Sequence, residues 1–309
     1  MSVTPDPTVV EIVNRGWDPR VRMFRVPNEI DTAVIVTDRY VVFVDTMSSP
    51  EQAAAVVESV EPLLADRAPL VINTHADWDH AWGNALFETP ASALPAPIIA
   101  SRETGKRLRS REEHDYLAKR QQQEPALANV RLVPPTIEIP SGCTIDGGDM
   151  TIELIPTPGH VGDHVSVWIP EIRLLLAGDA AEHPFPYCGE QSNIDVFLQS
   201  LRRLRELRPA IVIPCHGGQS NEGLLIRNMQ YFNRLDATIR SAQLQRGLEP
   251  GWYDKEGDLG EFIGFPFELA VREQGSDPAS ITDFYRSSHN KAIRAVAARV
   301  AAGEPPLTM

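Results

Sequence analysis

The sequence predicts an α/β protein in which two β-sheets pack together with helices on their outer faces. Three observations predict this class. Short apolar runs separated by turn residues fill residues 8–44, a second series of apolar runs begins near residue 130, and a segment of helical periodicity follows each series. The 309 residues are sufficient for one large domain with a deep core and a helical extension.

The first half of the chain contains short strands and one clear helix. Strands are expected at 8–13, 22–26, 32–37, 40–44, 69–73 and 97–100. Residues 50–65 follow a helical period, with Ser48 or Ser49 available as N-cap, and a short helix is expected near 81–88. The segment 102–122 is rich in Arg, Glu and Gln, which indicates a helical insertion exposed to solvent.

The second half repeats the order of strands followed by helix. Strands are expected at 130–139, 150–155, 164–169, 172–177 and 210–214, and a helix at 195–207. Beyond residue 222 the chain is expected to be mostly helical, with an interruption at 247–266 and a last helix near 280–302. We therefore expect a first domain at 1–222, which contains the insertion 102–122, and a C-terminal helical extension at 223–309 packed on it.

Composition and charge restrict the partners and the location of the protein. The net charge of −13 disfavours nucleic acid, because binding to phosphates depends on Lys and Arg. No apolar run is long enough to span a membrane, the first residues lack the pattern of a secretory signal, and three cysteines are too few for a disulfide framework. We expect a cytoplasmic protein with a small-molecule substrate and neither nucleic acid nor membrane as partner, and a homodimer is left open.

Four potential metal ligands lie within six residues, directly after the strand at 69–73. They are His75, Asp77, Asp79 and His80. A strand end holds its loop rigidly, and Asp and His are rarely kept together unless solvent or a metal compensates them. The pattern favours a metal site, and the alternative is a polar turn in which one of the aspartates caps the following helix.

Three later segments strengthen the metal interpretation. His160 follows the run IELIP, Asp179 ends the run RLLLAG, and His216 follows the run AIVIP. Each residue lies in a tight Gly or Pro turn just after a hydrophobic strand. Packing alone does not account for three such residues in addition to the first cluster.

The order THxxxDH, PGH, GD and CHG resembles the metallo-β-lactamase fold hydrolases over roughly residues 20–220. The resemblance implies a four-layer αββα sandwich and two divalent metal ions, for which we expect zinc, with iron or manganese as alternatives. It implies His75 and His160 as ligands of the first ion, and Asp179 as a carboxylate that bridges both. The implied ligands of the second ion are Asp79, His80 and His216. Asp77 stands where the family pattern HxHxDH has a histidine, and we expect it to be an oxygen ligand.

The activity that this resemblance implies is hydrolysis of an ester-like bond in a small molecule by a metal-bound hydroxide. A lactone, a thioester, a β-lactam or a related ester fits that description. The alternatives are a di-iron oxidoreductase on the same fold, which a carboxylate at position 77 keeps open, and a binding protein with a degenerate site.

Several residues near the predicted ligands are candidates for further roles. We expect Asp79 also to accept a hydrogen bond from the nucleophile. His183 is a candidate for substrate contact or proton donation, and Tyr187 for a hydrogen bond to developing oxyanion charge. Asp45, at the end of the run VVFVD, is expected to support the ligand loop. Trp82 either lines the substrate site or packs the next helix.

Overall fold

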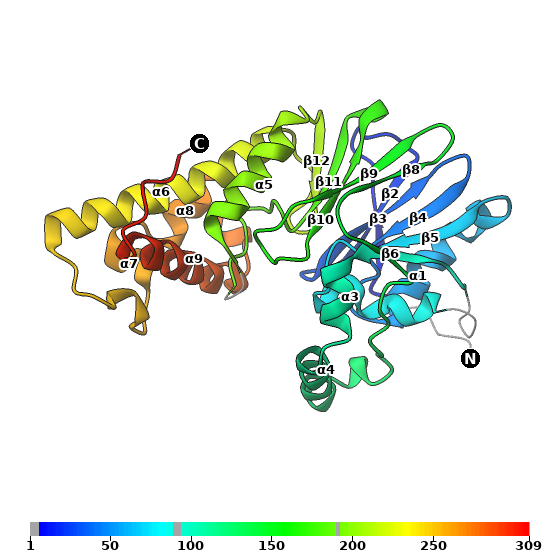
Figure 1. The fold of residues 1–309 in the computed structure, drawn as a ribbon, viewed down its shortest axis with the longest axis horizontal. Helices are drawn as coiled ribbons and strands as arrows, with labels where there is room; N and C mark the ends of the chain where they lie inside the picture. The colour runs from blue at the N-terminus through cyan, green and yellow to red at the C-terminus, as the bar shows by residue number, and fades with distance from the viewer. Residues whose placement is uncertain (1–5, 89–93, 190–191, 309) are drawn as a thin grey trace. The chain divides into compact units, whose positions relative to one another are not determined.

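The computed structural model of the chain describes residues 6–88, 94–189 and 192–308 (Figure 1). It contains two compact units. The first comprises Met1–Pro156 and Asp163–Leu176, and the second comprises Thr157–Gly162 and Ala177–Met309. The predicted α/β class with two sheets and a helical C-terminal region is confirmed, whereas the domain boundary at residue 222 stays a prediction.

The first unit holds a seven-stranded sheet whose strands follow one another in chain order. Its strands are β1 (Val10–Ile12), β2 (Val21–Val26), β3 (Ile30–Val36), β4 (Tyr40–Val44), β5 (Ala68–Ile72), β6 (Ile98–Ser101) and β7 (Ile137–Ile139). Pairing is antiparallel from β1 to β4 and parallel from β4 to β7. Because β4 and β5 are parallel, with Val44 opposite Ile72, the residues that follow both strands emerge at the same edge of the sheet.

The helices of the first unit are α1 (Pro50–Val60), α2 (Trp78–Ala81), α3 (Arg102–Leu108) and α4 (Arg111–Gln123). Ser49 caps α1 by accepting a hydrogen bond from the Gln52 amide, which confirms one of the two predicted caps. The helix predicted near 81–88 is the single turn α2 followed by a 3₁₀ helix at Trp82–Phe87.

The charged insertion differs from its prediction in two respects. It consists of two helices, because the first ends at Leu108 and Ser110 caps the second by accepting a hydrogen bond from the Glu113 amide. It is also exposed on one side only. Leu117 is buried in a cluster with Trp82, Leu127 and Val130, so that α4 covers part of the core.

The second sheet has five strands in the order β12-β11-β10-β9-β8. Their bounds are β8 (Cys143–Asp146), β9 (Thr151–Pro156), β10 (Val165–Ile169), β11 (Leu174–Gly178) and β12 (Ile211–Pro214). The edge strand β8 was not predicted, because its residues are half exposed and flanked by turn residues. The strand predicted at 130–139 is reduced to β7, since Pro134 and Pro135 cannot donate to a sheet ladder.

The second unit is mainly helical beyond its strands, as predicted. Its helices are α5 (Ile194–Glu206), α6 (Gly223–Arg246), α7 (Leu259–Ile263), α8 (Phe267–Glu273) and α9 (Asp283–Ala301). Tyr231 of α6 stacks on Phe185 and hydrogen-bonds His289 of α9 through its hydroxyl at 2.8 Å. Among the described residues, no helix has the length and apolar character needed to cross a membrane.

Candidate metal centre

The loop after β5 brings the four predicted ligands of the first unit together. His75 and His80 are fully buried, and their ring centroids are 3.9 Å apart. The Asp77 carboxylate lies 3.6 Å from Nε2 of His75, and the Asp79 carboxylate lies 3.8 Å from Nε2 of His80. Two imidazoles and two carboxylates in such proximity form a donor set that suits a divalent transition metal.

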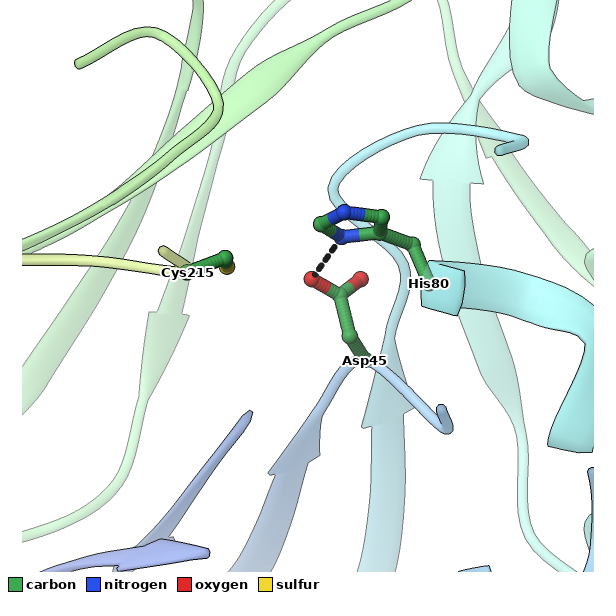
Figure 2. A group of neighbouring side chains, drawn as sticks. All are labelled: Asp45, His80 and Cys215. Atoms are coloured by element: carbon green, nitrogen blue, oxygen red, sulfur yellow. Dashed lines mark hydrogen bonds and ion pairs between the residues drawn. The ribbon is translucent and has the colours of Figure 1, made fainter. Parts of the chain in front are cut away.

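Asp45 holds this loop from the end of the neighbouring strand β4. Its carboxylate accepts hydrogen bonds from the Thr74 amide at 2.7 Å, from the Thr74 hydroxyl at 2.8 Å, and from Nδ1 of His80 at 2.9 Å. Figure 2 shows the last of these contacts. A proton on Nδ1 leaves Nε2 of His80 unprotonated and available to a metal. The predicted support of the ligand loop by Asp45 is confirmed.

Asp77 occupies the N-cap position of α2, but its side chain makes no capping hydrogen bond. One carboxylate oxygen instead accepts a hydrogen bond from Arg107 at 2.6 Å. The capped turn considered from the sequence is therefore not what this side chain forms. Arg107 was missed by sequence reasoning, because an arginine on a charged helix carries no signal of such a contact.

Asp163 and His164 also lie against the ligand loop. Asp163 is buried, accepts a hydrogen bond from the Ala76 amide at 2.9 Å, and pairs with Arg107 at 2.7 Å. The ring centroid of His164 is 5.0 Å from that of His75. The one sequence signal for Asp163 was its place three residues after a predicted ligand.

In the second unit, Asp179 lies between two histidines. One of its carboxylate oxygens is 3.5 Å from Nε2 of His160, and the other is 3.4 Å from Nε2 of His216. His160 and Asp179 are buried, whereas His216 is partly exposed. Asp179, His160 and His216 thus bring three potential metal-binding groups together in this unit.

The turn that carries His160 is constrained by its surroundings. Gly159 has a φ of +149°, and a Cβ at this position would lie 2.4 Å from the Cα of Phe197 in α5. Only glycine fits this approach. Nδ1 of His160 faces the carbonyl oxygen of Tyr187 at 3.3 Å, which directs Nε2 toward Asp179.

Glu182 was not predicted, although it is the acidic residue of the loop after Asp179. It is buried, and its carboxylate accepts hydrogen bonds from the Tyr187 amide at 2.9 Å and from the Tyr285 hydroxyl at 2.7 Å. Its carboxylate belongs with His160 and Asp179 to a group of donor atoms within 4.8 Å of one another. Burial, followed by the charge of Asp179, raises the pKa of Glu182 to about 6.

The two remaining predicted site residues also lie in this loop. Burial, assisted by Arg227, lowers the pKa of His183 to about 4, so the ring is neutral at pH 7. The ring centroid of Tyr187 lies 5.6 Å from that of His160. The Tyr187 hydroxyl accepts a hydrogen bond from Nζ of Lys291 at 2.9 Å.

Trp82 takes the structural role considered for it from the sequence, and Cys215 is also a core residue. Trp82 is fully buried in the cluster under α4, so it packs the helix rather than lining a substrate site. Cys215 is buried at the end of β12.

The chain is similar to known proteins in both sequence and fold. The model of the family described as "Metallo-beta-lactamase superfamily" matches residues 26–216, which is more than half of the chain. The chain is 35% identical over 77 residues to "Beta-lactamase-like protein 2 homolog" of Caenorhabditis elegans, a match that covers 24% of this chain and 23% of that protein. It is 24% identical over 209 residues to "Metallo-beta-lactamase type 2" of Bacillus sp. (strain 170), which covers 63% and 70%, respectively.

A solved structure, "Metallo-beta-lactamase from Pontibacter korlensis", is similar to this chain with a TM-score of 0.54 and 16% identity. The match covers 70% of this chain and 96% of that one, and it shows a shared fold. The chain thus spans most of that structure but less than a quarter of the Caenorhabditis elegans relative.

Proposed function

Because this chain belongs to the metallo-beta-lactamase superfamily, we propose that it is a metal-dependent hydrolase that uses a pair of divalent ions to cleave an ester-like bond in a small molecule. The observation that carries the proposal is the position of Asp179. Its two carboxylate oxygens face two different histidines of one compact unit at 3.4 and 3.5 Å. A buried carboxylate between two imidazoles supports a metal site, because all three groups are common ligands of divalent transition metals.

The proposed ligands follow the order of the motifs. His75, Asp77 and His160 would bind the first ion, and Asp179 would contact both. Asp79, His80 and His216 would bind the second ion. All of these donors are nitrogen or carboxylate oxygen, a mixture that suits zinc and also admits iron or manganese. A cytoplasmic location and a homodimer stay predictions.

When bound, two divalent ions would supply an activated water and polarise the bond under attack. The residues of the chain would prepare the site for this chemistry. Asp45 keeps His80 in the tautomer that offers Nε2. Asp79 would accept a hydrogen bond from the attacking water and orient it. Since Lys291 donates to the Tyr187 hydroxyl, the proton of that hydroxyl is available to developing negative charge on the substrate.

The test combines elemental analysis with a substrate panel. Protein purified without added metal is expected to hold two divalent ions per chain and to hydrolyse at least one of a lactone, a thioester, a β-lactam and an aryl ester. Asp179→Asn should lose both properties. Asp115→Asn, which changes an exposed carboxylate on α4, should keep them. Iron together with oxygen consumption and no ester turnover would overturn the proposal in favour of redox chemistry.

A further inference from the structure

We propose that Arg107 is a positioning residue of the first metal site, which turns one carboxylate oxygen of Asp77 toward His75 and balances the charge of a carboxylate at this position. The inference rests on the proposed function. It assigns a role to the helical insertion, from which Arg107 comes and for which neither the motifs nor the family match supplies one.

The two oxygens of Asp77 have different partners. Nη2 of Arg107 donates to Oδ1 at 2.6 Å, and Oδ2 lies 3.6 Å from Nε2 of His75. Because Oδ1 is held by the guanidinium, Oδ2 is the oxygen directed at the candidate ligand His75. Asp77 would thus offer one oxygen to a metal, as the single nitrogen of a histidine would do.

Arg107 is itself held on its other side. Nη1 donates to Oδ1 of Asp163 at 2.7 Å. Oδ2 of Asp163 accepts hydrogen bonds from the Ala76 amide at 2.9 Å and from the Thr104 hydroxyl at 3.0 Å. Ala76 lies between His75 and Asp77 in the chain, so this network begins and ends on the ligand loop.

The charge of the guanidinium is balanced by its two partners. An arginine side chain is always cationic in proteins, and this one pairs with Asp77 at 2.6 Å and with Asp163 at 2.7 Å. Glu113 of α4 faces the same guanidinium at 3.9 Å, and burial raises the pKa of its carboxyl group to about 7. A cation placed between carboxylates offsets the negative charge that aspartate brings to a position occupied by neutral histidine in the family pattern.

A second arginine of the insertion contacts the same loop. The guanidinium of Arg120 in α4 lies over the ring of Trp78 at 4.3 Å from its centroid. Trp78 stands between Asp77 and Asp79 in the chain. The insertion therefore supports the ligand loop at two neighbouring positions.

The test is a pair of substitutions made in two backgrounds. Arg107→Met and Arg107→Lys are compared in the natural chain and in Asp77→His, and Zn²⁺ affinity is measured for each ion by competition with a chelator. We expect Arg107→Met to lower the affinity for one of the two Zn²⁺ ions by about 10–100-fold, which is the range typical of residues that orient a metal ligand. The Zn²⁺ affinity of Arg107→Lys should lie between that of Arg107→Met and that of the natural chain. The lysine ammonium keeps the charge but lacks the two separate NH₂ groups with which the guanidinium pairs the two carboxylates. In the Asp77→His background, Arg107→Met should change affinity less than about 3-fold, since no carboxylate remains at position 77 for Arg107 to orient.

A control variant and three possible outcomes distinguish failure of the role proposed for Arg107 from failure of the proposed function. Arg109→Met removes an exposed arginine at the end of α3 that pairs with Glu138, and it should leave both affinities unchanged. Unchanged affinity in Arg107→Met, or an equal loss in both backgrounds, would refute the role toward Asp77. If Arg107→Met does not fold because Asp163 is left unpaired, Arg107→Lys in the two backgrounds decides the same question. A natural chain that binds fewer than two ions would overturn the proposed function itself and this inference with it.

Discussion

Asp45→Asn tests whether the hydrogen bond to His80 prepares that histidine for a metal. Asp45 has a φ of +63°, a conformation that asparagine tolerates, so the substitution does not strain the backbone. The asparagine amide can still accept from the Thr74 amide with its oxygen. Its NH₂ group would then face Nδ1 of His80, which must accept instead of donate, and the ring proton moves to Nε2. A protonated Nε2 cannot bind a metal.

The magnitude follows from the contacts. Loss of a residue that fixes a ligand's tautomer costs about 10–100-fold in metal affinity, which corresponds to about 1.4–2.8 kcal/mol. Asp45 also accepts three hydrogen bonds as a buried anion. Replacement of these by weaker neutral bonds should lower the free energy of unfolding of the metal-free protein by about 1–3 kcal/mol.

The assay is Zn²⁺ competition with a chelator, together with urea unfolding of the metal-free protein. Asp31→Asn is the matched control, because it replaces another buried carboxylate, which pairs with Arg25 at 2.6 Å and does not touch the ligand loop. It should lose stability but little metal affinity. If Asp45→Asn bound Zn²⁺ as tightly as the natural chain, the tautomer argument would be refuted.

Three further substitutions test the second unit. Asp179→Ala should abolish turnover while circular dichroism stays unchanged, and full activity would contradict its assignment as a shared ligand. Glu182→Gln should reduce the pH dependence of the stability of the metal-free protein. Because the pKa of Glu182 is raised from 4.5 to about 6, its contribution to stability is present below pH 4.5 and is lost as pH rises through 6. Urea unfolding at pH 4.5 and 7.5 measures this difference. Gly159→Ala should lower the free energy of unfolding by about 2–4 kcal/mol through its clash with Phe197, and an unchanged melting temperature would show that the turn relaxes freely.

The predicted ligands could be found from the sequence because each follows an apolar strand in a short turn. His75, His160 and His216 carry that local signal without any knowledge of their neighbours. Arg107 and Glu182 do not. Arg107 contacts Asp77, which lies 30 residues earlier in the chain, and Glu182 contacts Tyr285, which lies 103 residues later. Pairing between residues so far apart leaves no periodic pattern in a single sequence.

The same distinction applies to the fold. Strands β3, β4 and β10 are nearly continuous apolar runs, so they were predicted closely. The edge strand β8 alternates between exposed and half-exposed residues and owes its conformation to pairing with β9, of which Thr144 opposite Glu153 is one example. The charged insertion divides into two helices next to Ser110, which is the N-cap of α4. One serine among other polar residues gives little sequence signal for a helix boundary.

The stacking of Arg120 on Trp78 gives the protein an intrinsic optical reporter. The indole of Trp78 lies next to a guanidinium and is flanked in the chain by two aspartates, so its emission should respond to changes in nearby charge. Arrival of a divalent ion at the neighbouring aspartates would change that charge and, with it, the wavelength and yield of the fluorescence. Ion loading could therefore be followed in real time by emission spectroscopy without any attached dye, with Trp78→Phe to identify the source of the signal.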